Sequence, residues 1–220
     1  MASGATADQV SADEFFARAR ARLTLDVPAG LTDPDFVPRV GDHTLDPVMA
    51  AIAAVRPIRP AAVLVPIVAR AEPTVLLTQR TAHLKNHAGQ ISFPGGKIEA
   101  PDANPLAAAL RETEEEVGLT ARFIAPIGYL DLYLSAFGFR IVPVLARVEP
   151  GFELRLNRAE VDEAFEVPLA FLMAPANHQV HTRPWQGMTR THYAMPFGER
   201  NIWGATAGIL RNLYERVYRE

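Results

Sequence analysis

Three glutamates, Glu112, Glu115 and Glu116, stand at spacings of three and four residues in one short stretch of this sequence. On an α-helix these spacings place side chains on one face, so the three carboxylates would be neighbours. Neighbouring carboxylates repel by roughly a few tenths of a kcal/mol per pair, and the negative end of the helix dipole adds to the repulsion. A divalent cation that prefers oxygen ligands, Mg²⁺ or Mn²⁺, would offset it and could be shared with substrate phosphates. The alternative is a solvated acidic face on which Arg111 pairs with Glu115.

The residues around these glutamates predict a helix with both ends marked. Asn104 is a good N-cap residue, Pro105 suits the first helical position, and Gly118 suits the stop after the last turn. The apolar side chains gather on a second face, separate from the glutamates. That face consists of Leu106, Ala109, Leu110, Thr113 and Val117. The helix is therefore expected to pack on a core through one face and to present carboxylates on another.

Runs of β-branched and apolar residues predict strands on both sides of this helix. The expected strands are Ala61–Val68, Thr74–Thr78, Gln90–Phe93, Phe123–Tyr133 and Phe139–Val148. The first two are expected to be adjacent, and the third ends at Pro94-Gly95-Gly96, a sequence typical of a tight loop. A helix is expected to start near Arg158 and another to span about Ala205–Tyr218, with Trp203 packed in the core.

The N-terminal sixty residues contain no motif, but they do contain two helix signals. Ser11 precedes a capped helix with Phe15 and Phe16 on its apolar stripe, and Val48–Val55 predicts one short helix within a proline-rich arm. Residues 1–10 are small and polar, as in a frayed terminus. We expect an N-terminal extension over 1–60, partly disordered, and a main domain over 61–220. The extension would mediate a homodimer or simply cover the main domain.

The composition is that of a globular protein and excludes several classes of site. The chain has 220 residues, of which 49% are hydrophobic and 21% charged, so it can bury a substantial core. Its net charge of −3 gives no basic surface for nucleic acid, and no apolar run approaches the roughly 20 residues that span a membrane. The absence of cysteine excludes disulfides and thiolate chemistry. The first ten residues lack the features of a signal peptide, so a cytoplasmic location is expected. His178, His181 and His192 are expected in loops.

Gly96 and the run Arg111-Glu112-Thr113-Glu114-Glu115-Glu116-Val117-Gly118-Leu119 resemble the signature of the Nudix hydrolases. Asp102 stands where the usual pattern has a glutamate, Thr113 replaces an aliphatic residue, and one extra residue precedes Arg111. Upstream, Leu76–Arg80 and His87–Gly96 resemble the additional motif of the coenzyme A diphosphatase branch, which tolerates that extra residue. With weaker similarities downstream, the resemblance covers about residues 61 to 213.

The resemblance implies an α+β protein with the Nudix fold, an α/β/α sandwich around a mixed β-sheet. It implies metal-dependent hydrolysis of the diphosphate bond of coenzyme A, or of a derivative, to 3′,5′-ADP and 4′-phosphopantetheine. A second interpretation keeps the chemistry but takes NADH, ADP-ribose or another nucleoside diphosphate derivative as substrate. A third is a non-catalytic nucleotide-binding regulator. In each case the partner is a small nucleotide.

The resemblance also implies roles for individual residues. Glu112, Glu115, Glu116 and the backbone of Gly96 would hold Mg²⁺ or Mn²⁺, and Arg111 would orient a glutamate. Glu112, Glu115, Glu160 and Glu163 are the candidates for activating water. The basic residues near the second motif are plausible phosphate contacts, the alternative being ordinary surface charge; they are Arg80, Lys85, His87 and Lys97.

Overall fold

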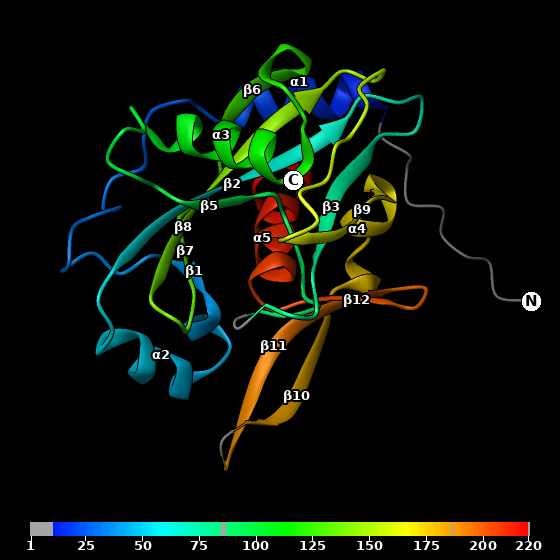
Figure 1. Cartoon of the computed structure of the whole chain (residues 1–220). Coiled ribbons are helices and arrows are strands. Elements are labelled where there is room, and N and C mark those ends of the chain that lie inside the picture. Colours follow the sequence, from blue (N-terminus) through cyan, green and yellow to red (C-terminus); the bar gives the residue numbers. More distant parts are fainter. Residues whose placement is uncertain (1–10, 85–86, 186, 220) are drawn as a thin grey trace, which may run out of the picture.

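The computed structural model describes residues 11–84, 87–185 and 187–219 as two β-sheets with helices packed against them (Figure 1). The helices are α1 (Ala12–Arg22), α2 (Pro47–Ala54), α3 (Pro105–Val117), α4 (Leu169–Met173) and α5 (Ala205–Leu213). The larger sheet contains β1 (Val40–Gly41), β2 (Arg59–Val68), β3 (Thr74–Arg80), β4 (Ile91–Ser92), β5 (Gly95–Lys97), β6 (Ile124–Tyr129), β7 (Tyr133–Leu134), β8 (Phe139–Val148) and β9 (Val161–Pro168). The smaller sheet contains β10 (Gln179–Trp185), β11 (Met188–Phe197) and β12 (Arg200–Trp203).

Strand β2 is the centre of the larger sheet. One of its edges pairs in parallel with β8 along the whole strand. Its other edge pairs antiparallel with β3 only near one end, where Ile67 lies opposite Val75, and with β5 only near the other, where Val63 lies opposite Gly95. Strand β3 also pairs antiparallel with β4 and β9. The sheet therefore divides between β3 and β5. The pairing of β2 with β3 confirms the predicted adjacency of the first two long strands.

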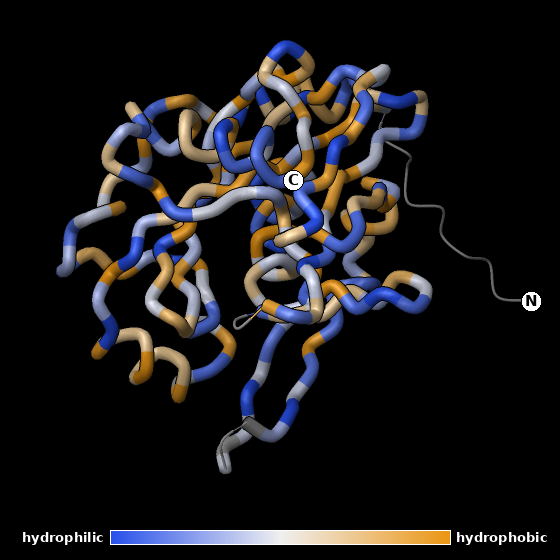
Figure 2. Tube along the Cα trace, viewed as in Figure 1, coloured by the Kyte–Doolittle hydropathy of each residue, from blue (hydrophilic) through white to orange (hydrophobic). Residues whose placement is uncertain are grey.

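The two faces of β2 belong to two different cores. Because side chains alternate along a strand, Val65 and Ile67 join the core beneath α1 and α5, whereas Leu64 and Val68 join the core beneath α3. Figure 2 shows hydrophobic colours along the strands between these helices. The mixed sheet with helices on both faces confirms the expected α+β class and the α/β/α sandwich.

Helix α1 begins where the sequence predicts it, since the Ser11 hydroxyl accepts a hydrogen bond from the Glu14 amide at 3.2 Å. Phe15 and Phe16 are fully buried, and the Phe15 ring lies 6.2 Å from that of Tyr218. The first described helix and the last turn of the chain therefore pack together in one core. The boundary expected at residue 60 stays a prediction, and residues 1–10 lie outside the described residues.

Helix α2 forms close to the predicted Val48–Val55 and is capped by Asp46, whose carboxylate accepts from the Val48 amide at 3.0 Å. The arm around it is less irregular than expected. Strand β1 pairs in parallel with β7, and a 3₁₀ turn, Asp42–Thr44, follows. The arm thereby reaches the edge of the larger sheet.

Two sequence interpretations of the later segments are wrong. Within the described residues no helix starts near Arg158; Val161 donates to the Asn157 carbonyl at 2.9 Å in a turn that leads directly into β9. The expected single strand over Phe123–Tyr133 is divided into β6 and β7, both of which pair antiparallel with β8 but leave residues 130–132 between them outside any strand. Both differences arise from pairing with distant strands, which a local pattern does not record.

The smaller sheet is an antiparallel ribbon, β10–β11, to which β12 adds at the base. Figure 1 shows the ribbon extending away from the larger sheet. His181 and His192 lie opposite each other in it, so their expected placement in loops is wrong, whereas His178 does lie in a loop. None of the helices in the described ranges is long and apolar enough to cross a membrane.

Candidate active site

Helix α3 is fixed at both ends and along its buried face. The Asn104 side chain accepts from the Ala107 amide at 2.9 Å, and Gly118 ends the helix with φ of 70°, a left-handed conformation that favours glycine. Thr113 is fully buried, and its hydroxyl donates to the Ala109 carbonyl at 2.6 Å. This hydrogen bond satisfies the one polar atom that Thr113 brings into an otherwise apolar face. The helix is thereby held with its glutamates toward β5.

Glu116 is the most deeply buried of the three helix glutamates, with 4% of its surface exposed. Its carboxylate accepts from the Gly95 amide at 3.1 Å and lies 3.5 Å from the Arg80 guanidinium. Burial nevertheless raises the pKa of Glu116 to about 7, and the charges of Glu112 and Glu160 act in the same direction. The protein alone therefore stabilises the ionised form poorly, and a cation at this position would stabilise it.

Glu112 lies against β5 so closely that only glycine fits opposite it. A Cβ atom on Gly96 would stand 2.4 Å from the Glu112 carboxyl carbon. Burial raises the pKa of Glu112, opposed by its ion pair with Arg111 and reinforced by the charges of Glu115 and Glu160. Glycine is needed here for close approach rather than for an unusual backbone conformation.

Arg111 connects the acidic side chains around it. Its guanidinium donates to both oxygens of Asp102, each at 3.0 Å, to Glu112 at 2.9 Å and to Glu115 at 3.2 Å. A further bond, at 3.2 Å, reaches the Lys97 carbonyl on β5. The hydrogen bonds from Arg111 hold the pKa of Asp102 below its usual range. The Arg111–Glu115 pair of the alternative interpretation is present, but as one contact of several.

Of the two later glutamates that are candidates for activating water, Glu160 lies near α3 and Glu163 is bound elsewhere. Glu160 is close enough to raise the pKa of both Glu112 and Glu116, and the turn before it is held to α3 by the Asn157 amide, which donates to the Glu116 carbonyl at 2.9 Å. Glu163 accepts from Arg200 at 2.6 Å on β12 instead. We call Glu112, Glu115, Glu116 and Glu160 the acidic cluster.

The acidic cluster offers oxygen atoms of the kind that a divalent cation binds. Among the described residues, no three His, Asp or Glu side chains stand in an arrangement that would hold a metal ion directly. Arg111 and Arg80 form ion pairs with the carboxylates of Glu112 and Glu116. The donor chemistry nevertheless fits a hard divalent cation, since the donors are carboxylate and carbonyl oxygens. The raised pKa of buried Glu116 points the same way.

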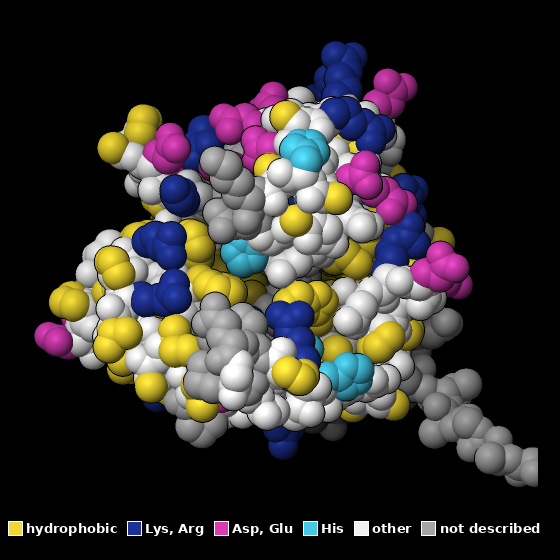
Figure 3. Space-filling model, turned by 60° about the horizontal axis from the view of Figure 1, so that its bottom comes forward, with side chains coloured by type: hydrophobic (Ala, Val, Ile, Leu, Met, Phe, Trp, Pro, Cys, Tyr) yellow, Lys and Arg dark blue, Asp and Glu magenta, His cyan; other side chains and the backbone are white. Residues whose placement is uncertain are grey.

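A cavity of about 300 Å³ lies beside the acidic cluster, between β5 and the start of α5. None of the four acidic-cluster residues lines it; the two features share Arg80 and the Gly95–Lys97 strand. In Figure 3 hydrophobic side chains gather around the hollow near the middle of the face, with lysine and arginine side chains beside it. A molecule in this cavity would therefore lie next to the carboxylates across one strand.

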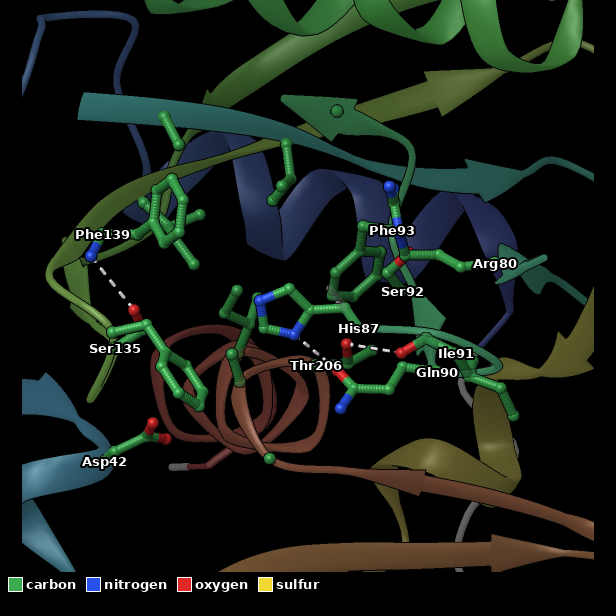
Figure 4. A pocket seen from close by; sticks show the side chains of 18 of the residues that line it. Asp42, Arg80, His87, Gln90, Ile91, Ser92, Phe93, Ser135, Phe139 and Thr206 are labelled. Carbon is green, nitrogen blue, oxygen red and sulfur yellow. Dashed lines mark hydrogen bonds between the residues drawn. The ribbon is translucent and has the colours of Figure 1, made fainter. Parts of the chain in front are cut away.

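Figure 4 shows His87 in the middle of this cavity, between an end with Arg80 and Ser92 and an end with Asp42 and Ser135. His87 has φ of 58°, and its ring nitrogen Nδ1 lies 2.9 Å from the Gln90 side-chain oxygen. Of the basic residues expected at phosphates, Arg80, His87 and Lys97 line the cavity, and Lys85 lies outside the described residues.

Several cavity residues were missed by the sequence interpretation. Trp203, expected in the core, lines the cavity, and Asp42, Phe137 and Arg190 line it as well. Asp102 was also missed, although its place at the usual glutamate position was a signal. For Asp42 and Arg190 there was no signal, because they are separated by 148 residues and belong to no motif.

Comparison with known proteins gives one family. A model of the NUDIX domain matches residues 58–185. An uncharacterized Nudix hydrolase, NudL, from Escherichia coli strain K12 is 40% identical over 155 residues, which cover 70% of this chain and 81% of NudL. Among solved structures, the Caenorhabditis elegans Ap4A hydrolase binary complex aligns with a TM-score of 0.41 at 22% identity over 51% of this chain and 81% of its own. The NUDIX domain of Shewanella oneidensis NrtR, complexed with ADP ribose, aligns with a TM-score of 0.41 at 22% identity, over 53% of this chain and 77% of its own.

Proposed function

Since the chain belongs to the Nudix family and is a hydrolase that acts on pyrophosphate bonds, we propose that it cleaves coenzyme A, or a derivative, to 3′,5′-ADP and 4′-phosphopantetheine. The observation that carries this proposal is the apolar cavity that adjoins the acidic cluster across Gly95–Lys97. His87, Gln90 and their neighbours in that cavity belong to the segment that resembles the coenzyme A diphosphatase branch.

Glu112, Glu115 and Glu116, with the Gly96 carbonyl, are proposed to hold Mg²⁺ or Mn²⁺. When bound, the cation neutralises charge on the diphosphate and polarises its phosphorus–oxygen bonds. Arg111 holds Glu112 and Glu115 in place, and Asp102 in turn orients Arg111 through two hydrogen bonds. The protein thus fixes the carboxylates before substrate arrives, which avoids reorganisation during the reaction.

Glu160 is proposed as the base that accepts a proton from the attacking water. Its charge acts on Glu112 and Glu116, so it lies at the same site, whereas the carboxylate of Glu163 is bound to Arg200. The water oxygen forms a bond to one phosphorus, the bond from that phosphorus to the bridging oxygen breaks, and the bridging oxygen leaves on the other product.

Arg80, His87 and Lys97 are proposed to bind the phosphates, together with Lys85. Lys97, on β5, and Arg80, at the end of β3, line the cavity next to the acidic cluster, so they can contact a diphosphate placed there. Positive side chains at this place offset the charge that otherwise repels a nucleophile from phosphorus.

The test is product analysis by mass-resolved chromatography. Coenzyme A, NADH and ADP-ribose are each incubated with the protein and Mg²⁺ or Mn²⁺, with a chelator-treated sample as control. We expect metal-dependent release of 3′,5′-ADP and 4′-phosphopantetheine, faster than cleavage of the other two. Faster cleavage of NADH or ADP-ribose would keep the chemistry and replace the substrate. Tight nucleotide binding without turnover of any diphosphate would support the non-catalytic regulator.

A further inference from the structure

Asp42, from the N-terminal arm, is buried at the end of the cavity that lies away from Arg80 (Figure 4). Its carboxylate accepts three hydrogen bonds: from the Tyr133 hydroxyl at 2.7 Å, the Ala136 amide at 2.9 Å and the Arg190 guanidinium at 3.0 Å. The arm thus joins the loop after β7 to strand β11, two segments of the cavity wall that are otherwise distant in sequence.

Arg190 has 4% of its surface exposed, yet it lines the cavity. Its guanidinium carbon lies 5.5 Å from the Phe137 ring centre and 6.0 Å from that of Trp203. Its Nε has no hydrogen-bond partner among the described residues. We call Asp42, Phe137, Arg190 and Trp203 the arginine wall.

A buried ion pair of this kind contributes little net stability, because desolvation of both charges offsets their attraction. Its clearer effect is to fix the position of the guanidinium. Asp46 adds a second restraint on β11, since its carboxylate accepts from the Thr191 amide at 2.9 Å while it also caps α2. Two successive residues of β11 are therefore held by the arm.

The chemistry of the arginine wall selects for a particular kind of ligand group. Arginine offers only donors, so a group that meets Arg190 must supply an acceptor. Asp42 already neutralises the charge of Arg190, which favours a neutral acceptor such as an amide carbonyl over a second phosphate. Phe137 and Trp203 add aromatic surface that suits methylene or methyl groups.

We infer that the arm segment 40–46 completes the substrate site, with Asp42 as a positioning residue that holds Arg190 so that the arginine wall binds the amide-bearing chain of the substrate. The inference rests on the proposed function: with the diphosphate at Arg80 and Gly96, the group attached to it extends past His87 toward Asp42. Selectivity between coenzyme A and ADP-ribose, which lacks an amide chain, is assigned to this wall.

The experiment compares Asp42→Asn, Arg190→Lys and Phe137→Leu with the unaltered protein, measuring KM and kcat for coenzyme A and for ADP-ribose. We expect KM for coenzyme A to rise by on the order of tenfold in each variant, with kcat nearly unchanged and with little change for ADP-ribose. The matched control is Glu166→Gln, which breaks an ion pair outside the cavity lining, in which Arg70 lies 2.7 Å from Glu166. This control should leave KM and kcat unchanged for both substrates. Equal losses on both substrates, or no loss on coenzyme A, would overturn the inference.

One of these variants and one further measurement keep the inference falsifiable. If the exchange at Asp42 prevents folding, Phe137→Leu decides alone, because it leaves the ion pair intact. Binding of 4′-phosphopantetheine is also measured by calorimetry, without turnover. If the unaltered protein cleaves no diphosphate, the proposed function fails, and the wall is still tested by whether Phe137→Leu weakens this binding by about tenfold relative to Glu166→Gln. Unchanged binding would contradict it.

Discussion

The acidic cluster lies beside one end of the cavity and the arginine wall lines the other end, and the two are built in different ways. Three of the four acidic-cluster residues come from one helix, and β5, the strand against which Glu112 and Glu116 lie, comes shortly before it in the chain. The arginine wall takes Asp42, Phe137, Arg190 and Trp203 from four separated segments. The first holds excess negative charge that a cation can neutralise, and the second holds a neutralised ion pair with aromatic rings. Chemistry common to all substrates is expected at the first, and discrimination between substrates at the second.

The largest effect is expected from Glu116→Gln, which removes one proposed metal ligand while keeping its shape. Turnover of every substrate should fall by roughly 10³-fold, whereas thermal stability in chelator should not fall, since a buried carboxylate with a raised pKa is replaced by a neutral amide. Steady-state kinetics and thermal unfolding measure both. Glu114→Gln, an exposed neighbour on the same helix, is the control. A loss confined to one substrate would contradict the assignment of the common chemistry to the acidic cluster and of substrate discrimination to the arginine wall.

Gly96→Ala tests how tightly the acidic cluster is packed against β5. The added Cβ would meet the Glu112 carboxylate, so this side chain must move, and a displacement of about 1 Å can reduce turnover roughly 100-fold. The fold should remain, because a side chain rather than backbone yields. Kinetics together with circular dichroism provide the readout. Normal activity would show that the position of Glu112 is not critical.

Asp102→Asn removes the charge that orients Arg111, which in turn holds Glu112 and Glu115. We expect metal affinity or turnover to fall about 10- to 100-fold, the range typical of residues that hold metal ligands in place. Asp102→Glu should restore much of the loss, because it returns the carboxylate. Metal titration monitored by thermal shift separates affinity from turnover. Unchanged metal affinity and turnover in Asp102→Asn would show that Asp102 plays no part in the site.

The smallest effect is expected from His192→Gln, next to Arg190 of the arginine wall, on the stability of the fold at acid pH. Burial, and then the charges of Arg183, Arg190 and His181, lower the pKa of His192. As the pH falls through 6.5, the usual value, the unfolded chain binds a proton at this residue before the folded protein does. The contribution of neutral His192 to the free energy of unfolding is therefore fully present above that pH and is lost as the pH falls below it. His192→Gln should flatten the pH dependence of the unfolding midpoint between pH 7 and 5. An unchanged slope would contradict this.

Much of the acidic cluster could be predicted from sequence because its parts are local. The caps Asn104 and Gly118 and the spacing of the glutamates lie within one helical segment, whereas Gly96 and Glu160 lie farther along the chain and were assigned by the family resemblance. The later turn at Asn157 was misinterpreted as a helix start because β9 is defined by pairing with β3. The hydrogen bonds that join Asp42 to Tyr133 and Arg190 arise only when the arm reaches the sheet edge. No local pattern indicates such contacts.

The parallel pairing of β2 with β8 also has a consequence for the order of folding. Strands β3, β4 and β5 and helix α3 all lie in the chain between these two strands, so three of the four acidic-cluster residues lie inside a loop that closes when β2 and β8 meet, and Glu160 follows soon after β8. The contact between Asp42 and Arg190 spans 148 residues and encloses that whole loop. Because closing a longer loop loses more chain entropy, the arginine wall should assemble after the acidic cluster. A refolding protein would then acquire its metal-dependent chemistry before its ability to choose among substrates.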